Sequence, residues 1–532
     1  MTTISSLPAA GLRPSSSSGA PASREDAAAA AVAPVAMPSS IVTLSPASVA
    51  AATQDGQGVE AAAGSPLLWE SPVRDKITSL VARNFFAPSV AGRFHGLGSA
   101  MLEQFQRDGA DQSQSVRQLP AGIQLYSSTP VLTMSKPVLH GQGDNQVSLT
   151  ISTKRGAEVK LMLDSTEDGL GVQLKTSGTL SEAERGAVAK LATAFQEAID
   201  GMAHEPPQLK LGGLMQFDPS LLASVDLHTV VKSPADPDST QTLDLHADAT
   251  QRKVSLSGAS GKMEVSVDLS QLAGLGTKAQ QAKAVASYLN QFDLAATRGH
   301  GDAALVTLFK DTFAELNGNN DAASLLAASG DQPARLTLSG EDHALLTGLA
   351  DFDATITQAA KAINPMRPNE KDAFSYRASQ STSINGHYQG DRSITQHQKL
   401  QLTASYHMPA VAGAQLRLDG GPEDQNYSYY QIEDSASSDA LMAYEQGRLT
   451  KASLRQSATQ SSREMKYAFG HLKSDFTTPG HSALQRDLVA ALAPDLKGER
   501  HRSLDEIYQR QQALREVSDL VPLQAYPDGG EN

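Results

Sequence analysis

The chain has 532 residues, with 44 Lys or Arg against 58 Asp or Glu, so its net charge is −14. This acidic balance argues against nucleic-acid binding, because a phosphate backbone requires a basic surface. The complete lack of cysteine excludes a disulfide scaffold, a thiol nucleophile, a Cys-ligated zinc and an iron–sulfur cluster. The length predicts about two to four domains, and no apolar stretch approaches the ~18 residues of a membrane span.

Residues 1–65 form a leader dominated by Ala, Ser, Pro, Gly and Thr. So little large apolar surface cannot offset the entropy of ordering the chain, which predicts disorder. The leader lacks the basic region and apolar run of a secretory signal peptide. Two interpretations stay open: a tail on a cytoplasmic protein, or an uncleaved leader for type III or flagellar-type export.

Residues 66–112 carry two helical patterns. Ser71 and Pro72 are suited to start a helix, and apolar residues then recur at helical spacing up to Phe85. A second pattern runs over about 97–107. Together they predict a helical hairpin.

Residues 113–365 show a repeated pattern of alternating strands followed by helices. In the first unit, the Ser181 to Glu184 capping box precedes a helix that carries Phe195. In the second, Thr277 caps a helix and another follows at 301–316. The strands are expected near 147–151, 159–163, 172–174, 243–245, 254–256 and 263–267. The pattern predicts an α+β fold of antiparallel β-meanders with helices packed on one face.

A third, partial unit is expected from a strand at 335–338. The helix predicted to follow it carries Leu345, Leu349, Phe352, Ile356 and Ile363.

Residues 366–475 form a Tyr-rich region, since eight of the twelve tyrosines lie between residues 371 and 470. Alternation with Ser, Thr and Gln predicts antiparallel strands with one solvated face. The tyrosines are expected in the sheet core and in cross-strand pairs, with a carbohydrate or protein contact surface as the alternative. Residues 476–532 are predicted to form C-terminal helices and a tail, because Leu484, Leu488 and Leu492 share a helical face.

One motif suggests a cofactor. Gly274, Gly276 and Ala279 match the G-x-G-x-x-G/A dinucleotide fingerprint, whose glycines admit a pyrophosphate at a helix N-terminus. The strands before it are meander strands rather than the first strand of a βαβ unit. These three residues are therefore weak candidates, and no cofactor is predicted.

Other candidate chemistry is sparse. His387, His397 and His407 recur every ten residues and are expected to be solvent-facing strand histidines rather than zinc ligands. No catalytic or metal-binding residue is predicted, and Asp434 and Asp439 form no recognisable catalytic pair.

Several segments resemble an uncharacterised proteobacterial family, a domain of unknown function. They begin at Trp69-Glu-Ser-Pro, Ile77-Thr-Ser-Leu, Gly96-Leu-Gly, Asp111-Gln-Ser, Ser177-Gly-Thr and Phe217-Asp-Pro. Some members of that family carry an automatic lactate dehydrogenase label. The fold pattern that such a label requires does not occur in this sequence, so the resemblance implies no active-site residue here.

The sequence thus predicts a non-enzymatic interaction or structural protein of a proteobacterium. Its partner is expected to be a protein of unknown identity, and its location cytoplasmic or exported without a cleaved signal peptide. Two alternatives stay open: a nicotinamide-dependent oxidoreductase that uses Gly274 to Ala279, and a type III secreted effector.

Overall fold

The structure is a computed structural model that describes residues 67–71, 75–119, 139–202, 208–232, 238–318, 336 and 338–492. The predicted leader, residues 1–65, lies outside these ranges. So do residues 335 and 337 of the strand predicted at 335–338 and the C-terminal residues after 492.

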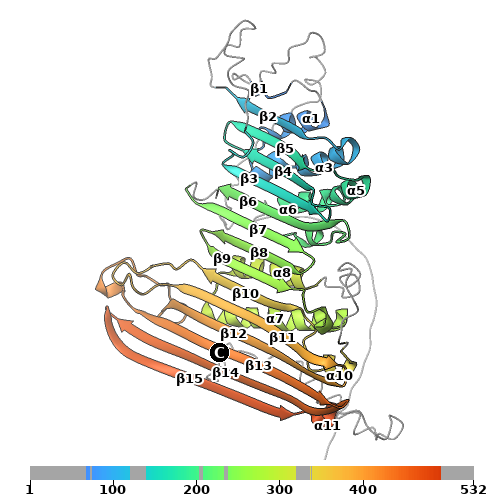
Figure 1. The fold of residues 1–532 in the computed structure, drawn as a ribbon. Coiled ribbons are helices and arrows are strands. Elements are labelled where there is room, and N and C mark those ends of the chain that lie inside the picture. The colour runs from blue at the N-terminus through green and yellow to red at the C-terminus, as the bar shows by residue number, and fades with distance from the viewer. Residues whose placement is uncertain are drawn as a thin grey trace, which may run out of the picture. The chain divides into compact units, whose positions relative to one another are not determined.

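One antiparallel sheet of 15 strands runs through the described chain, in the order β1-β2-β5-β4-β3-β6 and then consecutively to β15 (Figure 1). The strands are β1 (Leu67–Trp69), β2 (Gln112–Gln118), β3 (Asn145–Thr153), β4 (Glu158–Ser165), β5 (Gly169–Ser177), β6 (Leu222–Lys232), β7 (Thr240–Asp248), β8 (Gln251–Gly258), β9 (Gly261–Asp268), β10 (Asp351–Gln358), β11 (Ala373–Tyr388), β12 (Asp391–Pro409), β13 (Tyr427–Glu445), β14 (Arg448–Ala468) and β15 (His471–Asp487). Neighbours in sequence are mostly neighbours in the sheet, so the predicted meanders are confirmed.

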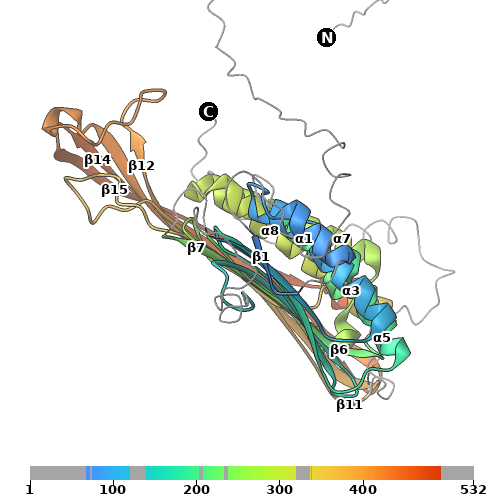
Figure 2. The ribbon, with the colours of Figure 1, turned by 90° about the horizontal axis from the view of Figure 1, so that it is seen from above.

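The helices lie on one face of this sheet (Figure 2). They are α1 (Lys76–Asn84), α2 (Val90–Phe94), α3 (Leu97–Asp108), α5 (Glu182–Ala189), α6 (Ala192–Met202), α7 (Lys278–Gly299), α8 (Ala303–Gly318), α10 (Gly340–His343) and α11 (Val489–Leu492). Short 3₁₀ turns occur at η2 (Gly212–Met215), η3 (Leu272–Gly274) and η4 (Pro422–Asp424). An α+β fold with helices on one face of an antiparallel sheet was predicted, and this coarse architecture is confirmed.

The separate helical hairpin predicted for 66–112 is not seen. The stretch forms three helices and also supplies β1 and the start of β2, and α3 packs against α5 and α6. The first helix begins at Lys76, where the Asp75 carboxylate accepts the Thr78 N–H at 2.7 Å. The apolar faces of these helices therefore pack on the common sheet as well as on one another.

Two predicted helices are strands. Residues 351–358 form β10, whose inward residues Phe352, Ala354 and Ile356 satisfy a period of two as well as a helical spacing. Residues 471–487 form β15, and the described part of the chain ends with the four-residue helix α11. In addition, the sequence did not predict β6, which pairs with both β3 and β7.

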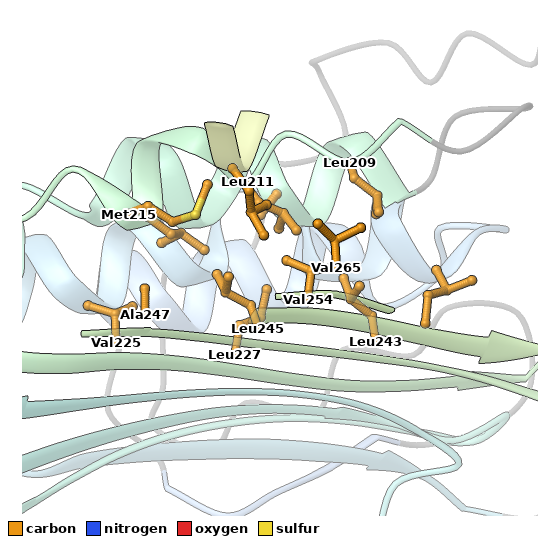
Figure 3. Packing of buried hydrophobic residues seen from close by; sticks show 14 of the residues in the cluster. Leu209, Leu211, Met215, Val225, Leu227, Leu243, Leu245, Ala247, Val254 and Val265 are labelled. Carbon is orange, nitrogen blue, oxygen red and sulfur yellow. The ribbon is translucent and has the colours of Figure 1, made fainter. Parts of the chain in front are cut away.

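A continuous hydrophobic core lies between the helices and the sheet. The segment at residues 208–216 fills the space over β6 to β9, between the helix groups (Figure 3). Its apolar side chains face those of the four strands, and all are buried: Leu209, Leu211, Met215, Val225, Leu227, Leu243, Leu245, Ala247, Val254 and Val265. The opposite face of the sheet carries exposed cross-strand ion pairs, including His228 with Asp244 at 2.6 Å.

Two buried ion pairs attach the helical layer to the long strands. Arg298 at the end of α7 contacts Asp434 of β13, with Nη2 to Oδ1 at 3.1 Å, and both side chains are buried. Gln460 of β14 donates to the same carboxylate at 3.0 Å. At α10, Asp342 accepts from Arg392 and Tyr444, each at 2.7 Å.

Candidate functional site

The glycine motif lies at the entry to α7 and has a packing role there. Gly274 ends η3, and the Gly276 N–H donates to the Gly348 carbonyl at 2.9 Å. A Cβ at Gly276 would lie 3.0 Å from the Gly348 Cα. The preceding strand, β9, is antiparallel to both of its neighbours. Gly276 is therefore required for the close approach of two backbone segments, and no feature of this loop supports a nucleotide site.

The three evenly spaced histidines are not brought together. His397 and His407 lie ten residues apart on the single strand β12, which corresponds to about 33 Å. His397 is exposed and pairs with Asp439 at 2.7 Å. The side chain of His407 is fully buried, so the prediction that it faces solvent is wrong. Within the described residues no group of three or more His, Asp or Glu side chains could hold a metal ion.

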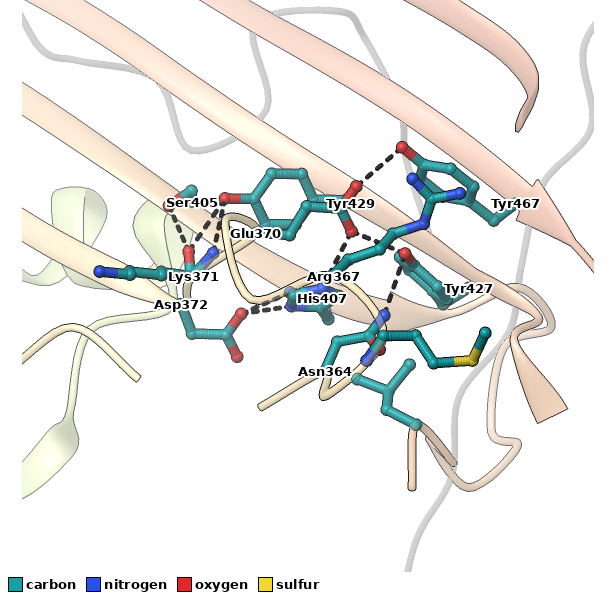
Figure 4. A network of polar contacts seen from close by, with 12 residues as sticks. Asn364, Arg367, Glu370, Lys371, Asp372, Ser405, His407, Tyr427, Tyr429 and Tyr467 are labelled. Carbon is teal, nitrogen blue, oxygen red and sulfur yellow. Dashed lines mark hydrogen bonds and ion pairs between the residues drawn. The ribbon is translucent and has the colours of Figure 1, made fainter. Parts of the chain in front are cut away.

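His407 belongs instead to a buried polar network that the sequence did not predict (Figure 4). Its Nδ1 lies 2.6 Å from Asp372, and its Nε2 lies 3.4 Å from Glu370. The phenols of Tyr427 and Tyr467 donate to Glu370 at 2.6 and 2.7 Å. Both imidazole nitrogens thus face carboxylates, and the ring lies beside those of Tyr427 and Tyr429, with centroids 5.1 and 4.7 Å away. The network holds the segment between β10 and β11 against β12 to β14.

Most tyrosines of the Tyr-rich region are in the core, as predicted. Five of the eight are buried, and these are Tyr376, Tyr427, Tyr429, Tyr444 and Tyr467, whereas Tyr388 is exposed at a hairpin. Asp434 and Asp439 lie on opposite faces of the sheet. The side chain of Asp434 is buried, and that of Asp439 is exposed. The described residues therefore do not assemble a recognisable catalytic pair from these carboxylates.

The last strand, β15, presents an open edge. Among the described residues it pairs with β14 and with no second strand. Directly after it, Leu488 donates its N–H to the Ala452 carbonyl of β14 at 2.8 Å. Backbone groups alternate in direction along an antiparallel strand. Even-numbered residues of β15 therefore point their N–H and C=O groups to β14, and odd-numbered residues from Asp475 to Asp487 point theirs outward.

This edge also exposes large apolar side chains. Leu472, Phe476 and Leu484 of the strand are 50%, 64% and 41% exposed, and Phe469 just before the strand is also exposed. Proteins usually shorten or cover such edges, because unpaired backbone groups can pair with another chain. Pro479 removes one outward N–H, but the strand is 17 residues long. Within the described chain, β15 is thus the surface best equipped to bind another polypeptide.

Among the described residues, no helix is long and apolar enough to cross a bilayer. A scan against protein-family models gave no match, and searches of the curated proteins and of the solved structures gave none either. The resemblance to an uncharacterised proteobacterial family therefore stays a prediction, and the function must be argued from this chain alone.

Proposed function

We propose that the protein is a non-enzymatic structural protein that assembles through its last strand, with two copies pairing β15 against β15. The observation that carries this proposal is the open edge of β15 together with its exposed apolar side chains. Pairing of two such edges would satisfy the outward backbone groups and join the two sheets. A second copy of the same strand is the occupant that the sequence of β15 favours.

The side chains of β15 are self-complementary about Gly480. In an antiparallel pair centred there, Phe476 of each copy faces Leu484 of the other on one sheet face. Thr478 faces Ser482 on the same face. Directly opposed pairs of this kind contribute roughly 0.2–1 kcal/mol each. Phe476 and Leu484, two of the apolar side chains that β15 exposes, would therefore cover one another in the dimer.

The charges select the same register. With Gly480 at the centre, Asp475 faces Gln485, and Asp487 lies toward Lys473 of the second copy. A register centred one residue later would place Asp475 opposite Asp487, and like charges in directly opposed positions are destabilising.

Cysteine cross-linking tests this register, because the natural chain has no thiol. The central pair of the dimer would be a non-hydrogen-bonded pair with Cα atoms about 4.5 Å apart, which lies within the range that a disulfide spans. Gly480→Cys should therefore form a covalent dimer under mild oxidation. Ser474→Cys is the matched control, since the two copies of residue 474 would be about 40 Å apart. Equal cross-linking of both variants, or none of either, refutes the register.

A second variant separates assembly from folding. His481 points its N–H outward, so His481→Pro removes an edge donor without breaking a bond to β14. Sedimentation should show a dimer for the natural chain and for His481→Ala, and a monomer with an unchanged circular dichroism spectrum for His481→Pro. A natural chain that stays monomeric at about 100 μM would contradict the proposal.

Hydrogen exchange gives an independent readout. Outward amides of β15, such as those of Thr477 and Ala483, should exchange fast at low protein concentration and more slowly once dimers form. Inward amides, such as those of Thr478 and Ser482, should be protected at both concentrations by their bonds to β14. Export stays a separate prediction, and it is tested by fractionating cultures with and without an active secretion apparatus.

A further inference from the structure

A cavity of about 190 Å³ lies between α7, the segment at residues 340–347 and the strands β12 to β14. It is distant in sequence from β15, and nothing in the dimer proposal depends on it. Both apolar and polar side chains line it. The apolar part includes Leu345, Leu346, Leu454, Ala440 and Ala284, and the polar part includes Gln398, His343, Ser287, Ser438 and Lys283.

Gln398 lines this cavity and carries a buried acceptor. The Thr347 N–H donates to Gln396 Oε1 at 2.9 Å, which fixes that atom as an acceptor. Gln398 Nε2 lies 3.4 Å from the same oxygen, so the nitrogen of Gln398 is turned toward Gln396. Gln398 is only 9% exposed, and its Oε1 has no hydrogen-bond partner in the described part of the chain.

His343 adds a second group without a partner. Its Nδ1 is buried and makes no hydrogen bond to any described residue. Burial lowers the pKa of His343, which favours the neutral imidazole at pH 7. Polar atoms left buried and unsatisfied in this way lower the stability of the fold. A molecule that donates hydrogen bonds would remove that loss of stability.

The size of the cavity limits the ligand. An apolar cavity of about 150 Å³ accommodates one benzene ring, so 190 Å³ is sufficient for one ring with one polar substituent. We propose that the cavity binds a small neutral molecule with an apolar body of about that size and an O–H or N–H group that donates to Gln398 Oε1. Leu345, Leu346 and Leu454 would contact the apolar body.

Phenol, toluene and benzoate are suitable probes, because they share one ring and differ in hydrogen bonding and charge. Titration of the full chain, followed by calorimetry or ligand-observed NMR, should show phenol binding about tenfold more tightly than toluene, the factor that about 1.4 kcal/mol represents. Benzoate should also bind more weakly than phenol, since its carboxylate cannot donate to Gln398. Preference for benzoate, or no binding of phenol at 10 mM, would overturn the proposal and leave a water-filled cavity.

Variants assign the binding to this cavity. Gln398→Leu should reverse the order of phenol and toluene, whereas Gln401→Leu, on the exposed face of the same strand, should leave it unchanged. Ser287 lines the cavity from α7 and is half-buried, so Ser287→Phe should fill the space and abolish binding of all three probes. Undiminished phenol binding by Ser287→Phe would place the probe elsewhere and refute the site, even if Gln398→Leu does not fold.

Discussion

The contact between α3 and α6 allows a direct test of the helical layer. Gly98 of α3 lies over the ring of Phe195 of α6, and both residues are buried. A Cβ placed on Gly98 would lie 2.5 Å from both Cδ1 and Cε1 of Phe195. Separations this short do not occur between real carbon atoms, so Gly98→Ala requires α3 or the ring to move.

Two effects of Gly98→Ala oppose each other. Alanine is a better helix former than glycine by up to about 1 kcal/mol. Inserting a methyl group into a packed core costs about 1–3 kcal/mol, and the fully buried ring of Phe195 has no solvent space to enter. Overpacking therefore wins, and Gly98→Ala should lower the free energy of unfolding by about 1–2 kcal/mol.

Gly186 supplies the control. It lies within α5, and a Cβ there would meet no atom within 4 Å. Gly186→Ala should therefore stabilise the chain by about 0.5–1 kcal/mol. Urea unfolding of each variant gives both values.

A double-mutant cycle isolates the contact itself. In a Phe195→Leu background, where the ring is missing, Gly98→Ala should become neutral or stabilising, which gives a coupling energy of about 1–3 kcal/mol. If Gly98→Ala stabilises the natural chain as much as Gly186→Ala does, the close packing of α3 on α6 is refuted.

Three further tests, each based on substitutions, address other parts of the fold. Phe195→Ala should cost about 3–5 kcal/mol by leaving a cavity, whereas Ser181→Ala, which removes a helix cap, should cost about 1 kcal/mol; equal losses in urea unfolding would contradict this. Asp434→Ala should cost about 3–5 kcal/mol, because it leaves the buried Arg298 without its carboxylate, and adding Arg298→Met should recover most of that loss in the same assay. Burial raises the pKa of Asp351, so its ionised form costs stability above the unfolded pKa of about 3.9. Asp351→Asn should therefore stabilise at pH 7 by an amount that shrinks as the pH falls through the raised folded-state pKa, and a gain independent of pH would argue against this cause.

The parts of the fold that the sequence predicts well are those with two agreeing local signals. The first meander alternates cleanly, and the helix after it starts at a capping box that the structure contains in full, with Ser181 and Glu184 bonded reciprocally. Thr277 likewise caps α7 through its side chain. Where alternation and capping coincide, local preference and tertiary packing favour the same structure.

The sequence is ambiguous where small or polar residues occupy inward positions. In β10 the central inward residue is Ala354, and its small side chain conceals the alternation, so the spacing of Leu349, Phe352 and Ile356 resembles a helix. In β6 the inward position at Thr229 is polar, which weakens the strand pattern. Only pairing with neighbouring strands settles these segments, and pairing is not encoded locally.

Polar residues at inward strand positions also indicate the cavity. Along β12 the inward positions run from Ile394 through Gln396 and Gln398 to Leu400. Two glutamines at the inward positions of an otherwise alternating strand indicate buried polar side chains. Such side chains need hydrogen-bond partners. The sequence cannot show which of the four amide atoms stays unpaired, because that depends on Thr347, which is 49 residues away from Gln396.

The wrong prediction of a helix where β15 lies has a different cause, and this cause bears on the proposed assembly. Leu484, Leu488 and Leu492 repeat every four residues, which favours a helix, yet the chain places Leu484 in an edge strand that leaves it 41% exposed. The apolar residues of β15 gain little burial from β14, its neighbour among the described strands, so the local sequence and the observed conformation disagree. Pairing with a second copy resolves the disagreement, because each Leu484 then contacts Phe476 across the new ladder and the outward backbone groups gain partners. The position at which local pattern and fold conflict is thus also the position at which an additional chain would stabilise the strand most.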